Sequence, residues 1–204
     1  MTISTWLTIV SICLLGAMSP GPSLAVILKQ TFNGGRKPGV IAAIAHGLGI
    51  GLYALACISG IAVMIVASPA LFLSLQWLGA AYLLWIGIKG LRSRAGQNPQ
   101  LADPPTYGSA ASDGFLVAFL NPKVAVFFIA LFSQFIGSET TWLEKLAYAL
   151  TAMFIDMGWY VVVAWSFSNQ RWLGYLQKNV VWLDRLFGVV LIALAVRLIA
   201  GVLP

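Results

Sequence analysis

The stretch "GAMSPGPSLAV", residues 16–26, lies inside the first long apolar segment of the chain and places Pro20 and Pro22 on either side of Gly21. Proline in a helix interior removes a backbone donor and clashes with the preceding turn, at a cost of about 3 kcal/mol. We therefore expect a helix in this segment to be interrupted near residues 19–22. Whether such a break can be tolerated depends on the environment of the segment, which the composition indicates.

The composition indicates a membrane protein, because 60% of the residues are hydrophobic and only 9% are charged, whereas soluble domains carry about 25% charged residues. Apolar runs of about 18 or more residues are typical of membrane-spanning helices. Six such runs are present, at residues 5–28, 40–66, 71–88, 115–136, 143–165 and 183–203. No basic residue precedes the first run, so we expect it to remain as a helix rather than to be cleaved as a signal peptide. The fold class is an all-α integral membrane protein with six transmembrane helices.

Basic side chains collect in alternate connections of this six-helix pattern. The connections after the first, third and fifth runs hold Lys29, Arg36, Lys37, Lys89, Arg92, Arg94, Arg171, Lys178 and Arg185. The opposite side holds Lys145 alone. Since basic residues favour the cytoplasmic side, we expect both termini to face outward. The basic residues form no patch with interleaved aromatics, so the net charge of +6 does not indicate a nucleic-acid partner.

A polar linker at residues 93–113 divides the chain near its midpoint. The fourth apolar run contains Asn121, Pro122 and Lys123, and Pro122 follows Pro20 by half of the 204 residues. Two repeats of three spans each would enter the membrane in opposite directions, as in many secondary transporters. We therefore expect one transporter domain over 1–204, with inverted repeats at 1–92 and 114–204 and with helices 1 and 4 interrupted at proline.

One feature of the prolines does not fit perfect inversion. The expected boundaries place both Pro20 and Pro122 nearer the cytoplasmic ends of their helices, whereas inversion would place one nearer each side. Either the boundaries differ from these, or helix 4 begins with a re-entrant segment.

Paired breaks in corresponding helices are a sequence pointer to a transporter binding site. A break frees backbone groups that lipid cannot satisfy, and each new helix N-terminus attracts anions such as a carboxylate. The alternative is a pair of proline kinks that serve packing alone. The predicted substrate-binding residues are Ser19, Pro20, Gly21, Pro22, Asn121, Pro122 and Lys123.

Two ionisable residues, Lys123 and Asp156, lie deep in apolar sequence. A charge at the centre of a membrane helix costs about 2.5 to 3.5 kcal/mol and usually pairs, faces a cavity or relays protons. A structural ion pair between the two is one alternative. Asp156 is otherwise the best candidate to exchange a coupling proton or to bind a substrate ammonium group.

His46 lies in the second run, where it either lines the pathway or bonds a neighbouring helix. Gly47 and Gly51 beside it have the spacing of close helix packing, within one chain or in a homo-oligomer. Cys13 and Cys57 form no CxxC motif and are expected to be small buried hydrophobes. They leave open a membrane thiol oxidoreductase as an alternative. No metal-binding spacing, nucleotide motif or catalytic motif is present in the sequence, so we expect no metal, no cofactor and no enzyme.

Three segments resemble the LysE/RhtB superfamily of bacterial amino-acid exporters: "LLGAMSPGPSLAVI", "LGAAYLLWIGIKGLRS" and "GFLVAFLNPKVAVFFIALFSQFI". Asp156 in "FIDMGWY" is similar to that family's pattern, whereas His46 is not a position that the resemblance covers. The resemblance implies efflux of amino acids across the bacterial inner membrane, driven by the proton gradient.

The charge count favours a neutral substrate, such as a threonine-, homoserine- or leucine-like amino acid. A site for lysine or arginine would offer further anionic partners in the membrane, and Asp156 alone is expected there. Backbone carbonyls could recognise a cation instead, so export of basic amino acids or of another small solute or cation remains the alternative.

Overall fold

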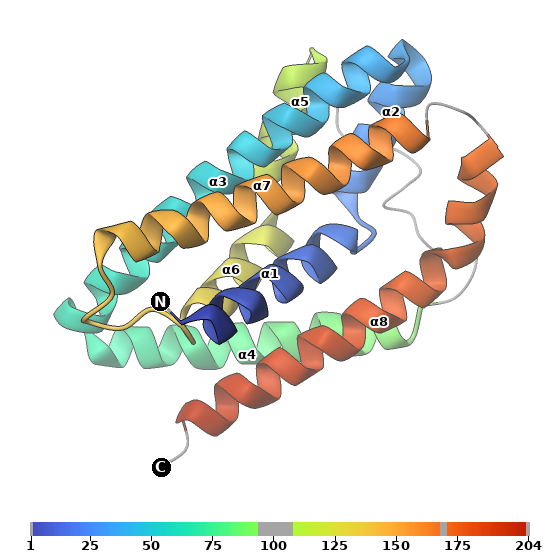
Figure 1. Ribbon diagram of the computed structural model, residues 1–204. Coiled ribbons are helices and arrows are strands. Elements are labelled where there is room, and N and C mark those ends of the chain that lie inside the picture. The colour runs from blue at the N-terminus through green and yellow to red at the C-terminus, as the bar shows by residue number, and fades with distance from the viewer. Residues whose placement is uncertain (1, 94–107, 168–170, 203–204) are drawn as a thin grey trace.

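The computed structural model describes residues 2–93, 108–167 and 171–202, which form eight helices. Two short helices, α1 (Ile3–Met18) and α2 (Pro22–Gly34), precede the long helices α3 (Arg36–Ala67) and α4 (Pro69–Leu91). The second half repeats this order with α5 (Ala110–Phe119), α6 (Pro122–Phe132), α7 (Trp142–Ser166) and α8 (Arg171–Val202) (Figure 1). The predicted all-helical class is confirmed.

The predicted interruptions are present in both halves. Helices α1 and α2 meet at an angle of 59°, and α5 and α6 meet at 50°. In each pair the second helix begins at a proline, whose missing N–H costs nothing at the first helical position. Helices α3, α4 and α7 are each long and apolar enough to cross a membrane, and each bent pair adds one span if it crosses as a unit. These are up to five spans in the described part of the chain; the sixth, in α8, stays a prediction.

The predicted ends of the two broken helices were wrong; if each bent pair crosses the membrane as one span, the corrected ends no longer conflict with inversion. Helix α2 continues to Gly34 and α5 begins at Ala110, so each break divides its pair into pieces of similar length. At 1.5 Å per residue, α1 and α2 are about 24 and 20 Å long, and α5 and α6 about 15 and 17 Å. Lys29 consequently lies within α2, and Arg36 and Lys37 form the first turn of α3 rather than a loop.

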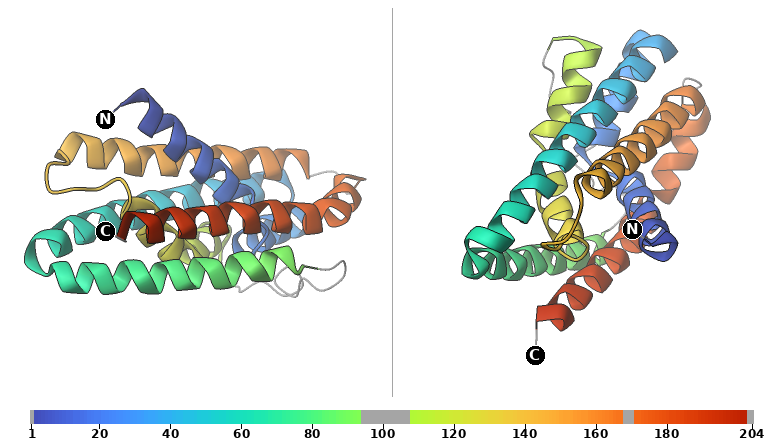
Figure 2. Two further views of the ribbon diagram at one scale, coloured as in Figure 1. Left: turned by 90° about the horizontal axis from the view of Figure 1, so that it is seen from below. Right: turned by 60° about the vertical axis from the view of Figure 1, so that its left-hand side comes forward.

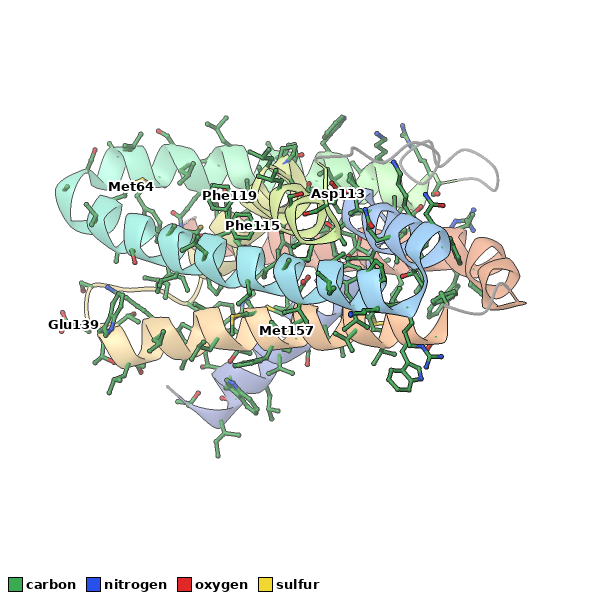
Figure 3. All side chains as sticks on the ribbon, turned by 90° about the horizontal axis from the view of Figure 1, so that it is seen from above. Met64, Asp113, Phe115, Phe119, Glu139 and Met157 are labelled. Atoms are coloured by element: carbon green, nitrogen blue, oxygen red, sulfur yellow. The ribbon has the colours of Figure 1, made fainter. Side chains whose placement is uncertain are left out.

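The last residues of the predicted linker are helical, and the final one, Asp113, is buried. Asp113 was expected in a flexible connection, but it lies in the first turn of α5 with no exposed surface and accepts a hydrogen bond of 2.6 Å from Gln30 of α2. Asp113, Phe115 and Phe119 all belong to α5 (Figure 3). Residues 94–107 of the predicted linker lie outside the described residues.

The two most extensive helix contacts, α3 with α7 and α4 with α8, join corresponding helices of the two halves. Glycines allow the first: a Cβ on Gly47 would lie 2.6 Å from Met157 Cβ, and one on Gly51 would lie 2.8 Å from Met153 Sδ. Gly87 and Gly188 have the same role between α4 and α8. The small-residue spacing around His46 therefore serves contacts within the chain.

The connections are sorted between the two ends of the molecule. The start of α1, the α3–α4 turn, the α6–α7 connection and the end of α8 lie at one end, and the α2–α3 turn and the end of α4 lie at the other (Figures 1 and 2). Large apolar side chains remain exposed along the helices between the two ends, for example Leu48, Leu52, Trp85 and Phe154. An exposed apolar belt of this kind is the surface that lipid covers.

Candidate functional site

The two helix breaks open onto one cavity, which has an empty volume of about 570 Å³ including its open part. Its lining comes from α1, α2, α3, α6, α7 and α8, together with the residues of the breaks. One part of the lining is polar, and the rest is apolar and largely aromatic, including Phe127, Phe128 and Phe187. Ligand pockets of small molecules combine these features, with an apolar wall and a few placed polar groups.

The first break presents the N-terminus of α2 to the cavity. Ser19 ends α1 in an extended conformation, Gly21 is also extended, and α2 begins at Pro22. Gly21 has no side chain that could cap α2, so the first backbone N–H groups of α2 have no side-chain cap as a hydrogen-bond partner. Ser19, Gly21, Pro22 and Ser23 line the cavity.

The second break presents the N-terminus of α6. Asn121 caps this helix, and its side-chain oxygen accepts a hydrogen bond of 3.0 Å from the backbone N–H of Lys123. The Asn121 amide also donates to the Ser23 hydroxyl at 3.3 Å, which joins the two breaks directly. Asn121, Lys123 and Val124 line the cavity, whereas Pro122 is exposed.

The Lys123 side chain crosses from one break to the other. Its Nζ donates to the Ser19 hydroxyl and, at 3.2 Å, to the Pro20 carbonyl oxygen, a group that the break leaves without a helical partner. The ammonium group also lies 4.6 Å from the centre of the Phe187 ring, within the range of a cation–π interaction. The cavity therefore has a fixed cation beside two helix N-termini.

Asp156 and His46 form a buried pair at the same cavity. His46 Nδ1 lies 2.6 Å from Asp156 Oδ2, and the two residues are 1% and 8% exposed. The Tyr160 ring packs edge-on against the imidazole, with the ring centres 4.8 Å apart. His46 lines the cavity and bonds to Asp156 of the neighbouring helix α7, while its position on a transport pathway stays a prediction.

The predicted alternative of a Lys123–Asp156 ion pair is wrong. Within the residues that the structure describes, Asp156 pairs with His46, and Lys123 is held by Ser19 and Pro20. Asp113 is a second buried acid, in the first turn of α5. Asp113 does not line the cavity, however, so the acid that the cavity contains is Asp156.

The structure brings together all but two of the predicted site residues, since Pro20 and Pro122 contribute no lining surface. It adds Tyr160 and Phe187, which the sequence prediction missed. Tyr160 lies one helical turn after Asp156 and therefore shares its face, a spacing that would have identified it. No predicted site residue lies in α8, so helical spacing could not have identified Phe187. The thiols of Cys13 and Cys57 are both free.

The model of the LysE type translocator family matches residues 14–201. A leucine efflux protein of Klebsiella pneumoniae is 29% identical over 187 residues, which are 88% of this chain and 87% of the relative. A homoserine/homoserine lactone efflux protein of Salmonella typhimurium is 30% identical over 194 residues, 92% of each chain. A membrane protein of Escherichia coli of uncharacterized function is 28% identical over 190 residues. No solved structure gives a significant match.

Proposed function

Because this chain belongs to the LysE type translocator family, we propose that it is a secondary transporter that exports neutral amino acids from the bacterial cytoplasm in exchange for protons. Two of the relatives it resembles over most of their length are named for the efflux of leucine and of homoserine. The expected family resemblance is confirmed. The substrate, the direction and the coupling ion for this chain are the proposal.

The observation that carries the proposal is the shared cavity, in which both helix N-termini and both deep ionisable groups meet. An amino acid at neutral pH has one carboxylate and one ammonium group. In the proposed complex the carboxylate lies between the N-termini of α2 and α6, where the uncapped N–H groups of α2 and the partial positive charge of both helix ends stabilise an anion. Lys123 supplies the full positive charge, and Ser19 and Asn121 supply hydrogen-bonding side chains. Pro20, Pro22 and Pro122 keep the breaks open, because none of them can donate a helical hydrogen bond.

Asp156 is proposed to bind the substrate ammonium group or to carry the coupling proton. The charges of the lining favour a neutral amino acid, since Lys123 matches one carboxylate and Asp156 matches one ammonium group. A lysine or arginine substrate would bring a second cation to a cavity that has one acidic side chain among its described residues.

We also propose that α1–α4 and α5–α8 are inverted repeats, so that the second repeat begins at Ala110 rather than at residue 114, and that α8 completes six spans in the inner membrane. The same order of one bent pair and two long helices in each half supports this proposal, as does the pairing of α3 with α7 and of α4 with α8. The start of α3 and the end of α4 lie at the end of the molecule opposite the start of α1 (Figure 2). The basic residues Lys37, Lys89 and Arg92 belong to these helix ends, which supports a cytoplasmic position for that end.

The proposal is tested with purified protein in vesicles loaded with one labelled amino acid at a time: leucine, homoserine, threonine, lysine or arginine. We expect release of a neutral amino acid, faster with an opposing proton gradient than without it. Release of lysine or arginine alone would replace the neutral substrate class by the basic one. Absence of movement of every amino acid, in protein that is folded and oriented, would contradict the export function.

A further inference from the structure

The His46 side chain lines the cavity, and its imidazole has one nitrogen engaged and one that is buried without a partner among the described residues. With Asp156 as a carboxylate, Nδ1 carries the ring proton and donates it across the 2.6 Å contact. The second nitrogen, Nε2, is then an acceptor with one lone pair. Asp156 thereby fixes the tautomer as well as the orientation of the ring, to which Tyr160 adds its edge-on contact.

Nε2 has no hydrogen-bond partner among the described residues, although the side chain is 1% exposed. Buried polar atoms are almost always paired, so an unpaired acceptor in a cavity wall points to a donor supplied by a ligand. His46 lines the same cavity as Asp156, Lys123 and the two helix N-termini. The ammonium group is the part of an amino acid that has N–H donors.

Building on the proposed export function, we propose that His46 Nε2 is where the substrate ammonium group and the antiported proton compete. When the imidazole is neutral, the Nε2 lone pair accepts an N–H from the ammonium group while Asp156 supplies the negative charge. When a proton from water binds Nε2, the ring becomes a cation with two donors, which repels the ammonium group. The proton later returns to water from the same nitrogen, so an amino acid and a proton cannot occupy this position together.

The other ionisable groups around His46 have different positions or partners. Asp156 and Tyr160 of α7 contact the imidazole, and Lys123 of α6 and Cys13 of α1 line the cavity. From the other helices packed on α3, Lys29 of α2, Asp113 of α5, and Tyr82 and Lys89 of α4 do not line it. Histidine is also the side chain whose charge ordinarily changes between about pH 5 and 8.

The test measures binding of labelled leucine and labelled homoserine to the full-length protein in lipid nanodiscs. For wild-type protein we expect the Kd of the bound amino acid to rise at least about tenfold from about pH 8 to about pH 6, because the proton and the ammonium group compete for the same nitrogen. The carboxylate 4-methylpentanoate, which is leucine without its amino group, serves as the control probe. Its binding should not weaken over the same range. Equal weakening of leucine and 4-methylpentanoate would overturn the proposal without reference to any variant.

Two variants of His46 distinguish the role of Nε2 from that of Nδ1. His46→Gln keeps a polar group at the position of Nε2 but cannot titrate, so we expect it to bind leucine at about pH 8 with a Kd nearly independent of pH. His46→Asn keeps a polar group at the position of Nδ1, which faces Asp156, but none at the position of Nε2. We therefore expect this variant to bind leucine more weakly than wild-type protein at every pH. Unchanged pH dependence in both folded variants would assign the proton to another group and overturn the proposal. If wild-type protein neither binds nor exports any amino acid, the export function itself fails, which is a separate result.

Discussion

At the scale of single residues, the cavity depends on side chains that connect parts of the chain far apart in sequence. Lys123 of α6 is bound to Ser19 and Pro20, and Asn121 is bound to Ser23. These contacts satisfy polar groups that two interrupted helices would otherwise leave unpaired in a membrane. The same groups surround the position proposed for the substrate carboxylate. A variant at one of them can therefore be tested both for stability and for substrate binding.

Lys123→Met should weaken leucine binding roughly tenfold to a hundredfold, because a hydrogen bond to a charged group contributes about 1.5 to 3 kcal/mol. Leucinamide has no carboxylate, and its binding should change little. Lys89→Met is the matched control, since Lys89 is exposed near the end of α4 and lies outside the cavity. Binding of leucine at wild-type affinity by folded Lys123→Met protein would contradict the proposed role.

Much of the cavity could be predicted from sequence, because its residues are of types that are rarely found in the middle of a membrane helix. Prolines inside an apolar run, and a lysine or an aspartate in the same setting, are costly in a membrane unless something compensates for them. The partners were not predictable in the same way. His46 and Asp156 are separated by 110 residues, and only the packing of α3 on α7 brings them together.

At the scale of helices, the fold depends on the close approach of α3 and α7. Gly47 and Gly51 lie on the face of α3 that meets Met157 and Met153, with no room for a further carbon atom. Gly60, on the same helix, has no heavy atom within 4 Å of an added Cβ and is exposed. The two kinds of glycine should therefore respond in opposite ways to the same substitution.

Gly47→Ala should destabilise the protein by about 1 to 3 kcal/mol, because its methyl group would overlap the Cα and Cβ of Met157. Gly60→Ala should instead stabilise by up to about 1 kcal/mol, because alanine loses less backbone entropy than glycine in a helix. Thermal unfolding in detergent measures both as shifts of Tm. Equal Tm values for the two variants would show that the stability of the protein does not depend on the close packing of α3 against α7 at Gly47.

Helix boundaries were the weakest part of the sequence prediction, and α5 explains why. Ala110, Ala111, Ser112 and Asp113 belong to a polar stretch by composition, so apolarity alone placed the start of this helix at residue 115. A Ser109 cap and the Gln30–Asp113 hydrogen bond start the helix earlier. These contacts are local or tertiary and do not change the hydropathy of the segment.

At the scale of the whole molecule, the two ends have different charge. The first turn of α3, which contains Arg36 and Lys37, lies at the opposite end from the α6–α7 connection, which contains Glu139 (Figures 1 and 3). Arg36 also lies 4.4 Å from the centre of the Trp165 ring near the end of α7. Basic and aromatic side chains at one end fit a cytoplasmic interface.

Cysteine accessibility tests this orientation in intact cells, in a background where Cys13 and Cys57 are replaced by alanine. Ser138→Cys, in the exposed α6–α7 connection, should react with a membrane-impermeant maleimide added outside. Ser109→Cys, exposed at the start of α5, should react only after the membrane is permeabilised. The reverse pattern would invert the proposed topology and place both termini in the cytoplasm.

The central position of α3 also determines the order in which the protein can be assembled. Its contacts with α5 and α7 are more extensive than those with α2 and α4 of its own half. During synthesis the first half therefore enters the bilayer before the principal partners of α3 exist. His46 meets Asp156 only after α7 is inserted, so the pair at the cavity is completed late in biogenesis. A chain that stalls before α7 therefore leaves the small-residue face of α3, with Gly47 and Gly51, uncovered.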